Sequence, residues 1–172
     1  MKLDDDDFTL FGLAPRFGID RQEVDVRWRA LQAQVHPDRF AAEGGSAQRQ
    51  AMQWAVRVNE AHRRLRDPLA RAAYLCELRG APIDADRHTA MPAPFLMQQM
   101  AWREALEEAG SADQVEALDL EVGRQEKALQ AELARHLDES LDLEAAVGAV
   151  RSLMFLGRFR ADIQRRMEAL ES

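Results

Sequence analysis

Apolar residues recur every three or four positions along most of this chain, which is the period of an amphipathic helix. One such stretch begins at Asp20, where Glu23 completes a capping-box variant, and has its apolar positions at Val24, Trp28, Leu31 and Val35. A second runs from Ser46, a candidate N-cap, to the Asp67-Pro68 pair, with an apolar stripe at Ala51, Ala55, Val58 and Leu65 on which His62 also falls. Short helices are predicted over residues 8–13 and 69–78, and nothing indicates a strand.

The second half of the chain shows the same period after an interruption. Residues 80–94 contain three prolines and little periodicity, which predicts a linker. Three helices are predicted beyond it, over residues 95–109, 111–138 and 143–170, and their short connections favour a three-helix bundle. The chain is therefore expected to be all-α, with one domain over 1–79, a linker over 80–94 and a second domain over 95–172.

Charge divides the chain in a similar way. The net charge of −7 is made up of −3 over residues 1–20, +3 over residues 21–94, −7 over residues 95–139 and zero over residues 140–172. The two halves could address different partners, or these charges could simply be solvated helix faces. The acidic run Asp4–Asp7 is interpreted as a solvated tail.

Composition excludes several classes of protein. A single cysteine, Cys76, rules out an internal disulfide framework and a multi-cysteine zinc site, and its apolar neighbours predict inert packing. No apolar run approaches the ~18 residues that span a membrane. Nucleic-acid binding is not expected of an acidic chain that has no aromatic stacking platform beside its basic cluster, Arg63, Arg64 and Arg66.

The tripeptide His36-Pro37-Asp38 lies between the first two long helices. Proline disfavours helix at the preceding residue and fixes its own φ, so the chain must turn there and expose His36 and Asp38. Such a corner can serve contact or catalysis. An acid–base pair or metal site would need converging groups, and no second His, Cys or carboxylate cluster has a suggestive spacing. No enzyme activity, metal or cofactor is therefore expected.

A helical hairpin whose loop contains His-Pro-Asp resembles the J domain, the module that stimulates DnaK-type chaperone ATPases. The resemblance extends to the HscB family of iron–sulfur co-chaperones and covers residues 8 to about 167. The segments that carry it are Phe8-Thr9-Leu10-Phe11-Gly12-Leu13, His36-Pro37-Asp38-Arg39-Phe40, Val58-Asn59-Glu60-Ala61, Leu65-Arg66-Asp67-Pro68-Leu69, Arg71-Ala72-Ala73-Tyr74-Leu75, Phe95-Leu96-Met97-Gln98-Gln99-Met100 with Arg103-Glu104, and Leu153-Met154-Phe155-Leu156.

This resemblance implies an L-shaped cytoplasmic co-chaperone with two partners. An HscA-type chaperone would bind the J domain, and an IscU-type scaffold would bind the C-terminal bundle. The chaperone-binding residues it implies are His36, Pro37, Asp38, Arg27 and Arg29. The scaffold-binding residues it implies are Leu96, Met97, Met100, Glu104 and Phe155. The family tends to have an acidic residue where this chain has Ala101, so that polar contact is not expected here.

Several alternatives stay open. Leu96 and Met100 could instead be core residues, and Trp102 could pack near the surface between the domains. In function, the chain could be a general J protein serving other clients, or a purely structural helical adaptor. An adaptor would be indifferent to mutation of the His-Pro-Asp corner.

Overall fold

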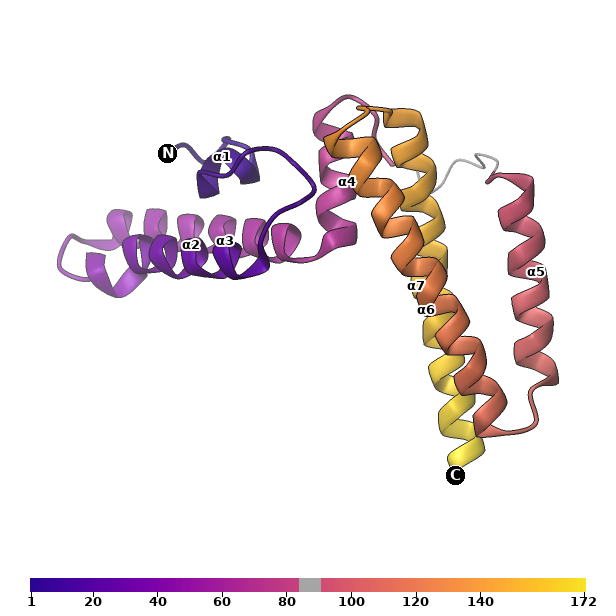
Figure 1. The fold of residues 1–172 in the computed structure, drawn as a ribbon. Helices are drawn as coiled ribbons and strands as arrows, with labels where there is room; N and C mark the ends of the chain where they lie inside the picture. The colour runs from indigo at the N-terminus through magenta and orange to yellow at the C-terminus, as the bar shows by residue number, and fades with distance from the viewer. Residues whose placement is uncertain (84–90) are drawn as a thin grey trace. The chain divides into compact units, whose positions relative to one another are not determined.

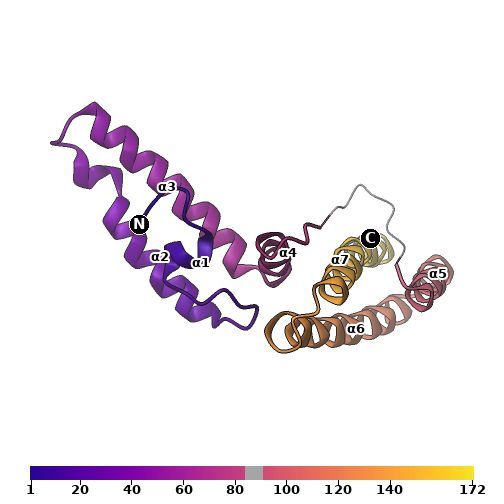
Figure 2. The ribbon, with the colours of Figure 1, turned by 90° about the horizontal axis from the view of Figure 1, so that it is seen from above.

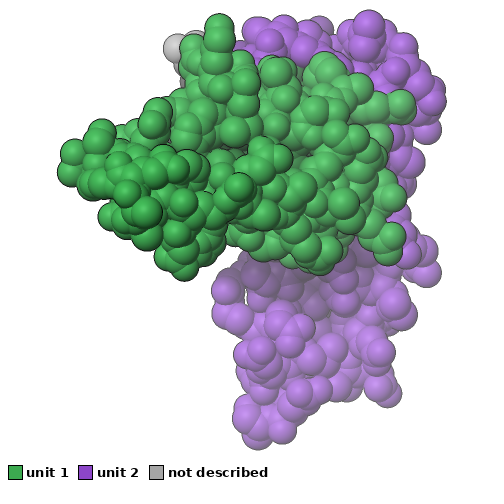
Figure 3. Space-filling view, turned by 90° about the vertical axis from the view of Figure 1, so that its left-hand side faces the viewer, with its two compact units in different colours: residues 1–75 green, residues 76–172 purple. Residues whose placement is uncertain are grey.

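The computed structural model describes residues 1–83 and 91–172, so that residues 84–90 of the expected linker lie outside the described part of the chain. By its contacts the chain divides into two compact units, Met1–Leu75 and Cys76–Ser172 (Figure 3). The described residues form helices and connecting turns and contain no strand. The all-α class is confirmed.

The first unit is built around a helical hairpin (Figure 1). Its elements are α1 (Asp7–Phe11), α2 (Arg21–Val35), the 3₁₀ turn η1 (Pro37–Phe40), α3 (Gly45–Arg66) and most of α4 (Pro68–Leu78). The contact face of α2 and α3 is apolar, as the period predicts: Val24, Val58 and Leu65 are fully buried, and the short helix α1 adds Phe8 and Phe11.

Of the two N-caps predicted from the sequence, one is confirmed and the other is wrong. Asp20 is the N-cap of α2, and its carboxylate accepts the backbone N–H of Gln22 at 2.9 Å. Ser46 is not the N-cap of α3. The N-cap is Gly44, two residues earlier, whose φ of +94° is a backbone conformation that side chains disfavour.

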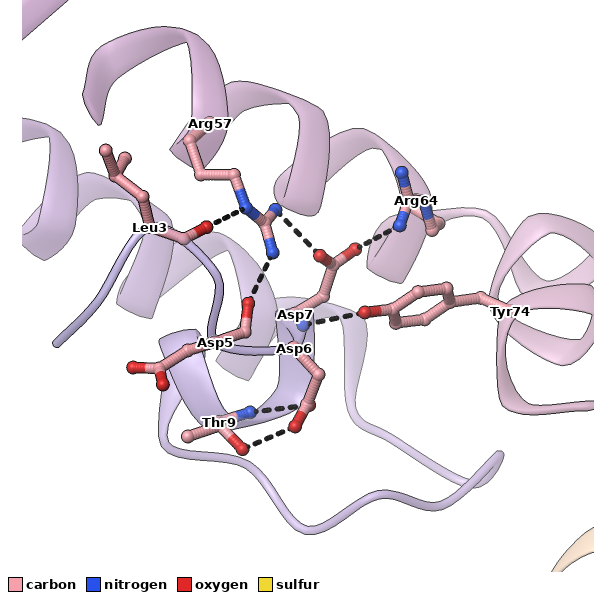
Figure 4. Close-up of polar contacts among 8 residues, drawn as sticks. All are labelled: Leu3, Asp5, Asp6, Asp7, Thr9, Arg57, Arg64 and Tyr74. Carbon is pink, nitrogen blue, oxygen red and sulfur yellow. Dashed lines mark hydrogen bonds and ion pairs between the residues drawn. The ribbon is translucent and has the colours of Figure 1, made fainter. Parts of the chain in front are cut away.

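The acidic N-terminal run is not a solvated tail, which corrects the interpretation from sequence (Figure 4). Asp6 is the N-cap of α1 and accepts hydrogen bonds from the backbone and hydroxyl of Thr9, at 3.0 and 2.7 Å. Asp7 is completely buried, and its carboxylate lies 2.8 Å from Arg57 and 3.3 Å from Arg64. Asp6 therefore caps α1, and Asp7 fastens α1 to α3.

The second unit consists of α5 (Ala93–Glu108), α6 (Ala112–Asp138) and α7 (Leu143–Glu171), preceded by the end of α4. Helices α6 and α7 pack along their length as a hairpin, whereas α5 contacts both much less extensively (Figures 1 and 2). The apolar residues along one face of α6 are buried throughout: Val115, Leu118, Val122, Leu129, Leu133 and Leu137. None of the described helices is long and apolar enough to cross a membrane.

Candidate partner-binding surfaces

The His-Pro-Asp corner is ordered by its own side chains. α2 ends at Val35, and His36 has an extended backbone with φ −61° and ψ 129°. Its Nδ1 accepts the backbone N–H of Asp38 at 3.2 Å, so His36 caps the turn η1. The side chains of His36 and Asp38 are 59% and 92% exposed. The corner thus holds both polar groups toward solvent.

A residue that sequence reasoning missed closes this corner. Arg39 donates from Nη1 to the backbone carbonyl of Ala33 at 2.9 Å. That carbonyl lies in the last turn of α2, where backbone acceptors have no partner within the helix. Arg39 therefore ties η1 back to α2 directly after Asp38. The signal was present in the sequence as a basic residue following a helix end.

The two basic residues expected beside the corner differ in their surroundings. Arg27 donates from Nη1 to the carbonyls of Phe11 and Gly12, both at 2.9 Å, and its Nη2 lies 2.6 Å from the Glu23 carboxylate. It holds the end of α1 against α2, a role that the sequence did not reveal. Arg29 is exposed on α2. Of the two charges, Arg29 is the one presented mainly to solvent.

The second candidate surface lies on α5. Leu96, Met97 and Met100 are 44%, 72% and 71% exposed, so the alternative that they belong to the core is wrong. Glu104, one turn after Met100, is also exposed. The outer face of α5 is therefore apolar over its first two turns and becomes acidic after them, a pattern typical of an interface.

Phe155, unlike the three apolar residues on the outer face of α5, is largely buried. Its side chain is only 6% exposed and lies between two aromatic rings, with centroids 5.9 Å from Phe95 and 6.0 Å from Phe159. The reason is that α7 packs against both α5 and α6, so that it buries two faces. Phe155 lies beneath the exposed face of α5, and its part in scaffold binding stays a prediction.

Trp102 differs from expectation. It is 3% exposed and packs inside the second unit, stacked on Phe159 with centroids 6.1 Å apart. Its indole N–H donates to the carboxylate of Glu121 on α6 at 3.2 Å. Trp102 is thus a core residue that connects α5 to both helices of the hairpin.

A histidine of the first unit has a partner of its own. His62 is partly buried, hydrogen-bonds through Nε2 to Asp25 at 2.8 Å and stacks on Trp28. This hydrogen bond, followed by the charge of Arg66, holds the pKa of Asp25 below its ordinary value. Within residues 1–83 and 91–172, no three His, Cys, Asp or Glu side chains come together as metal ligands.

The comparisons with known proteins cover both units. Residues 91–164 match the family model described as the HSCB C-terminal oligomerisation domain. The co-chaperone protein HscB homolog of Burkholderia mallei is 49% identical over 174 residues, covering 99% of each chain. The chain belongs to the HscB co-chaperone family. The corresponding protein of Burkholderia multivorans is 48% identical over 175 residues, covering 100% of this chain and 99% of the relative.

Solved structures of HscB proteins confirm the fold. Chaperone HscB from Vibrio cholerae is 33% identical, covers 96% of this chain and 99% of that one, and superposes with a TM-score of 0.81. Human co-chaperone HscB, at 24% identity, has a TM-score of 0.89 over 96% of this chain and 84% of that one. The family resemblance is confirmed, and so is the order of a J domain followed by a C-terminal helical domain.

Proposed function

We propose that this chain stimulates the ATPase of an HscA-type chaperone through its J domain and delivers an IscU-type scaffold to it during iron–sulfur cluster assembly in the cytoplasm. The observation that carries the proposal is the presence of two exposed and chemically different surfaces on one chain. The His-Pro-Asp corner is polar, and the outer face of α5 is apolar and acidic.

The corner suits a contact that alters another protein. His36 and Asp38 project from a turn held by the rigid Pro37, by the His36 cap and by the Arg39 bond to α2. A preorganised corner loses little conformational entropy when it binds. The hydrolysis chemistry belongs to the chaperone, and this chain favours one of its conformations through differential binding.

Positive charge on α2 supports the encounter with an acidic chaperone surface. Arg29 is exposed, whereas Arg27 is engaged with two backbone carbonyls and with Glu23. Long-range attraction raises the association rate and weakens with salt. Arg29→Ala is accordingly the variant that tests charge, because Arg27→Ala would also loosen α1.

The outer face of α5 supports a protein partner for the second domain. Methionine side chains adapt to irregular surfaces, and both methionines here are more than two-thirds exposed. Glu104 extends the face with negative charge. A scaffold that offers an apolar patch beside a basic residue would complement it. A general J protein, the second candidate, has no need of this face.

Steady-state ATPase of an HscA-type chaperone tests the proposal, with this protein and the scaffold added singly and together. We expect stimulation that exceeds the sum of the single effects. Losing a central interface contact costs about 2 kcal/mol, or roughly 30-fold in affinity. Asp38→Asn should therefore remove most of the stimulation at sub-saturating concentrations, and Leu96→Ala with Met100→Ala should remove only the scaffold-dependent part.

Two results would contradict parts of the proposal. Stimulation that does not depend on the scaffold, in wild type and in the α5 variant alike, would indicate the general J protein. An Asp38→Asn protein as active as wild type would show that the corner has no role in stimulation.

A further inference from the structure

Helix α5 depends on tertiary contacts for its stability. It has 16 residues, near the length at which isolated helices are marginal in water. It begins after Pro92, whose side chain has no atom that could accept a hydrogen bond from the first helical N–H groups. The exposed face formed by Leu96, Met97 and Met100 therefore exists only while α5 is docked on the hairpin.

Four aromatic rings provide much of that docking. Phe95 and Trp102, two turns apart on α5, face Phe155 and Phe159, one turn apart on α7. The ring centroids follow one another at 5.9 Å from Phe95 to Phe155, 6.0 Å from Phe155 to Phe159 and 6.1 Å from Phe159 to Trp102. We call these four residues the aromatic ladder. Rings at such distances attract one another beyond the area they bury.

Near the start of α5, the interface between this helix and the α6–α7 hairpin is not filled by side chains. A groove of about 870 Å³ lies there, lined by Phe95 and Gln98 of α5, by Leu129 of α6 and by Ala149 of α7. The other end of α5 is fastened, since Arg166 donates to the carbonyl of Ala109 at 2.8 Å. The turns that carry Leu96, Met97 and Met100 thus lie beside an open groove and rely on the aromatic ladder.

We propose that Trp102 and Phe159 are positioning residues for the scaffold-binding face of α5. This inference rests on the proposed scaffold binding. The two side chains are only 3% and 2% exposed, which leaves little of either to contact a partner directly. They act by keeping Leu96, Met97 and Met100 on one ordered helical surface.

The proposal predicts a particular kind of defect. A partner that binds only docked α5 has its apparent affinity reduced by the fraction of molecules in which α5 is docked. If the ladder is broken, the partner must order α5 as it binds. Coupled ordering gives a more negative heat-capacity change and a gain of helix on binding. Loss of a direct contact would produce neither signature.

The test uses the full chain and a purified IscU-type scaffold, with titration calorimetry at several temperatures and far-UV circular dichroism. Phe159→Ala and Trp102→Ala should bind at least tenfold more weakly, with a more negative heat-capacity change and helix gained on binding. Trp102→Phe keeps a ring in place and should bind nearly as well as wild type. Leu137→Ala, which removes a fully buried side chain near the far end of α6, is the matched core control and should keep wild-type affinity.

The outcomes separate this inference from the proposed function. If wild type does not bind the scaffold, the proposed function fails. If wild type binds and both alanine variants bind equally well without gaining helix, the positioning role is wrong. Should an alanine variant not fold, Phe159→Leu replaces it. Each variant should also stimulate the chaperone ATPase at the wild-type level in the absence of the scaffold, which would show that its J domain is intact.

Discussion

The carboxylate of Asp7 lies 2.8 Å from the guanidinium of Arg57, although the two residues are fifty positions apart in the chain and Asp7 is completely buried. Arg57 also donates to the backbone carbonyls of Leu3 and Asp5, at 3.2 and 2.7 Å. The backbone N–H of Asp7 donates to the hydroxyl of Tyr74 at 3.0 Å (Figure 4). One buried acid thus connects the N-terminal segment to α3 and α4.

Asp7→Asn should destabilise the J domain. The substitution keeps the shape but removes the charge that neutralises Arg57 and Arg64. Breaking a fully buried ion pair costs about 3–5 kcal/mol, and the partial exposure of both arginines lowers this to about 2–3 kcal/mol. Urea unfolding measures the loss, followed by the fluorescence of Trp28 and Trp54 in a Trp102→Phe background.

Asp4→Asn is the matched control, because it is the same chemical change at an exposed position. It should alter the free energy of unfolding by less than about 0.5 kcal/mol. Equal effects of the two substitutions would show that only the overall charge of the N-terminal run matters.

Two glycine-to-alanine substitutions should act in opposite directions. Gly157 lies within α7, and a Cβ there would meet no atom within 4 Å, so Gly157→Ala should stabilise by about 0.5–1 kcal/mol. Gly12 ends α1 at φ +64°, and a Cβ there would lie 3.0 Å from Nη1 of Arg27. Gly12→Ala should destabilise by about 1–2 kcal/mol. Urea unfolding of both variants checks the signs, and a shared sign would contradict the argument.

The helices could be predicted because a helix buried on one face has an apolar residue every three or four positions, which is visible in the local sequence. Helix α6 is the clearest case. Periodicity could not predict the burial of Asp7, since four consecutive acids resemble a solvated tail unless the position of Arg57 in space is known. The start of α3 was missed because Ser46 is a common N-cap residue, whereas Gly44 acts through its backbone.

The candidate surfaces were predictable to different degrees. The exposure of His36 and Asp38 follows from the proline between them. The exposure of Leu96 and Met100 could not be settled from sequence, because α5 has two apolar faces and periodicity does not say which one is covered. The burial of Phe155 could not be predicted either, because a helix that packs on two neighbours buries a wider arc than one stripe.

Asp25 should make stability depend on pH in the acid range. Its pKa in the folded protein lies below the ordinary value of about 3.9, first because His62 hydrogen-bonds to it and then because Arg66 lies 3.3 Å away. A lowered carboxyl pKa stabilises the fold above the unfolded-state pKa, and this stabilisation disappears as pH falls through the folded-state pKa. The difference in unfolding free energy between wild type and Asp25→Asn should therefore shrink as the pH falls below about 4. Urea unfolding across that range measures it, and a constant difference down to pH 2 would contradict the assignment.

Two substitutions of His36 can separate its structural role from its role in contact. Nδ1 accepts the N–H of Asp38, which leaves Nε2 to face a partner. His36→Asn places an amide oxygen near Nδ1 and keeps the cap, because asparagine accepts such a bond two residues on. His36→Gln places its amide near Nε2 and weakens the cap. We expect both variants to lose nearly all stimulation of the chaperone ATPase, with normal thermal stability for His36→Asn. Wild-type stimulation by His36→Asn would instead show that the imidazole only holds the corner in place, and that Asp38 alone makes the contact.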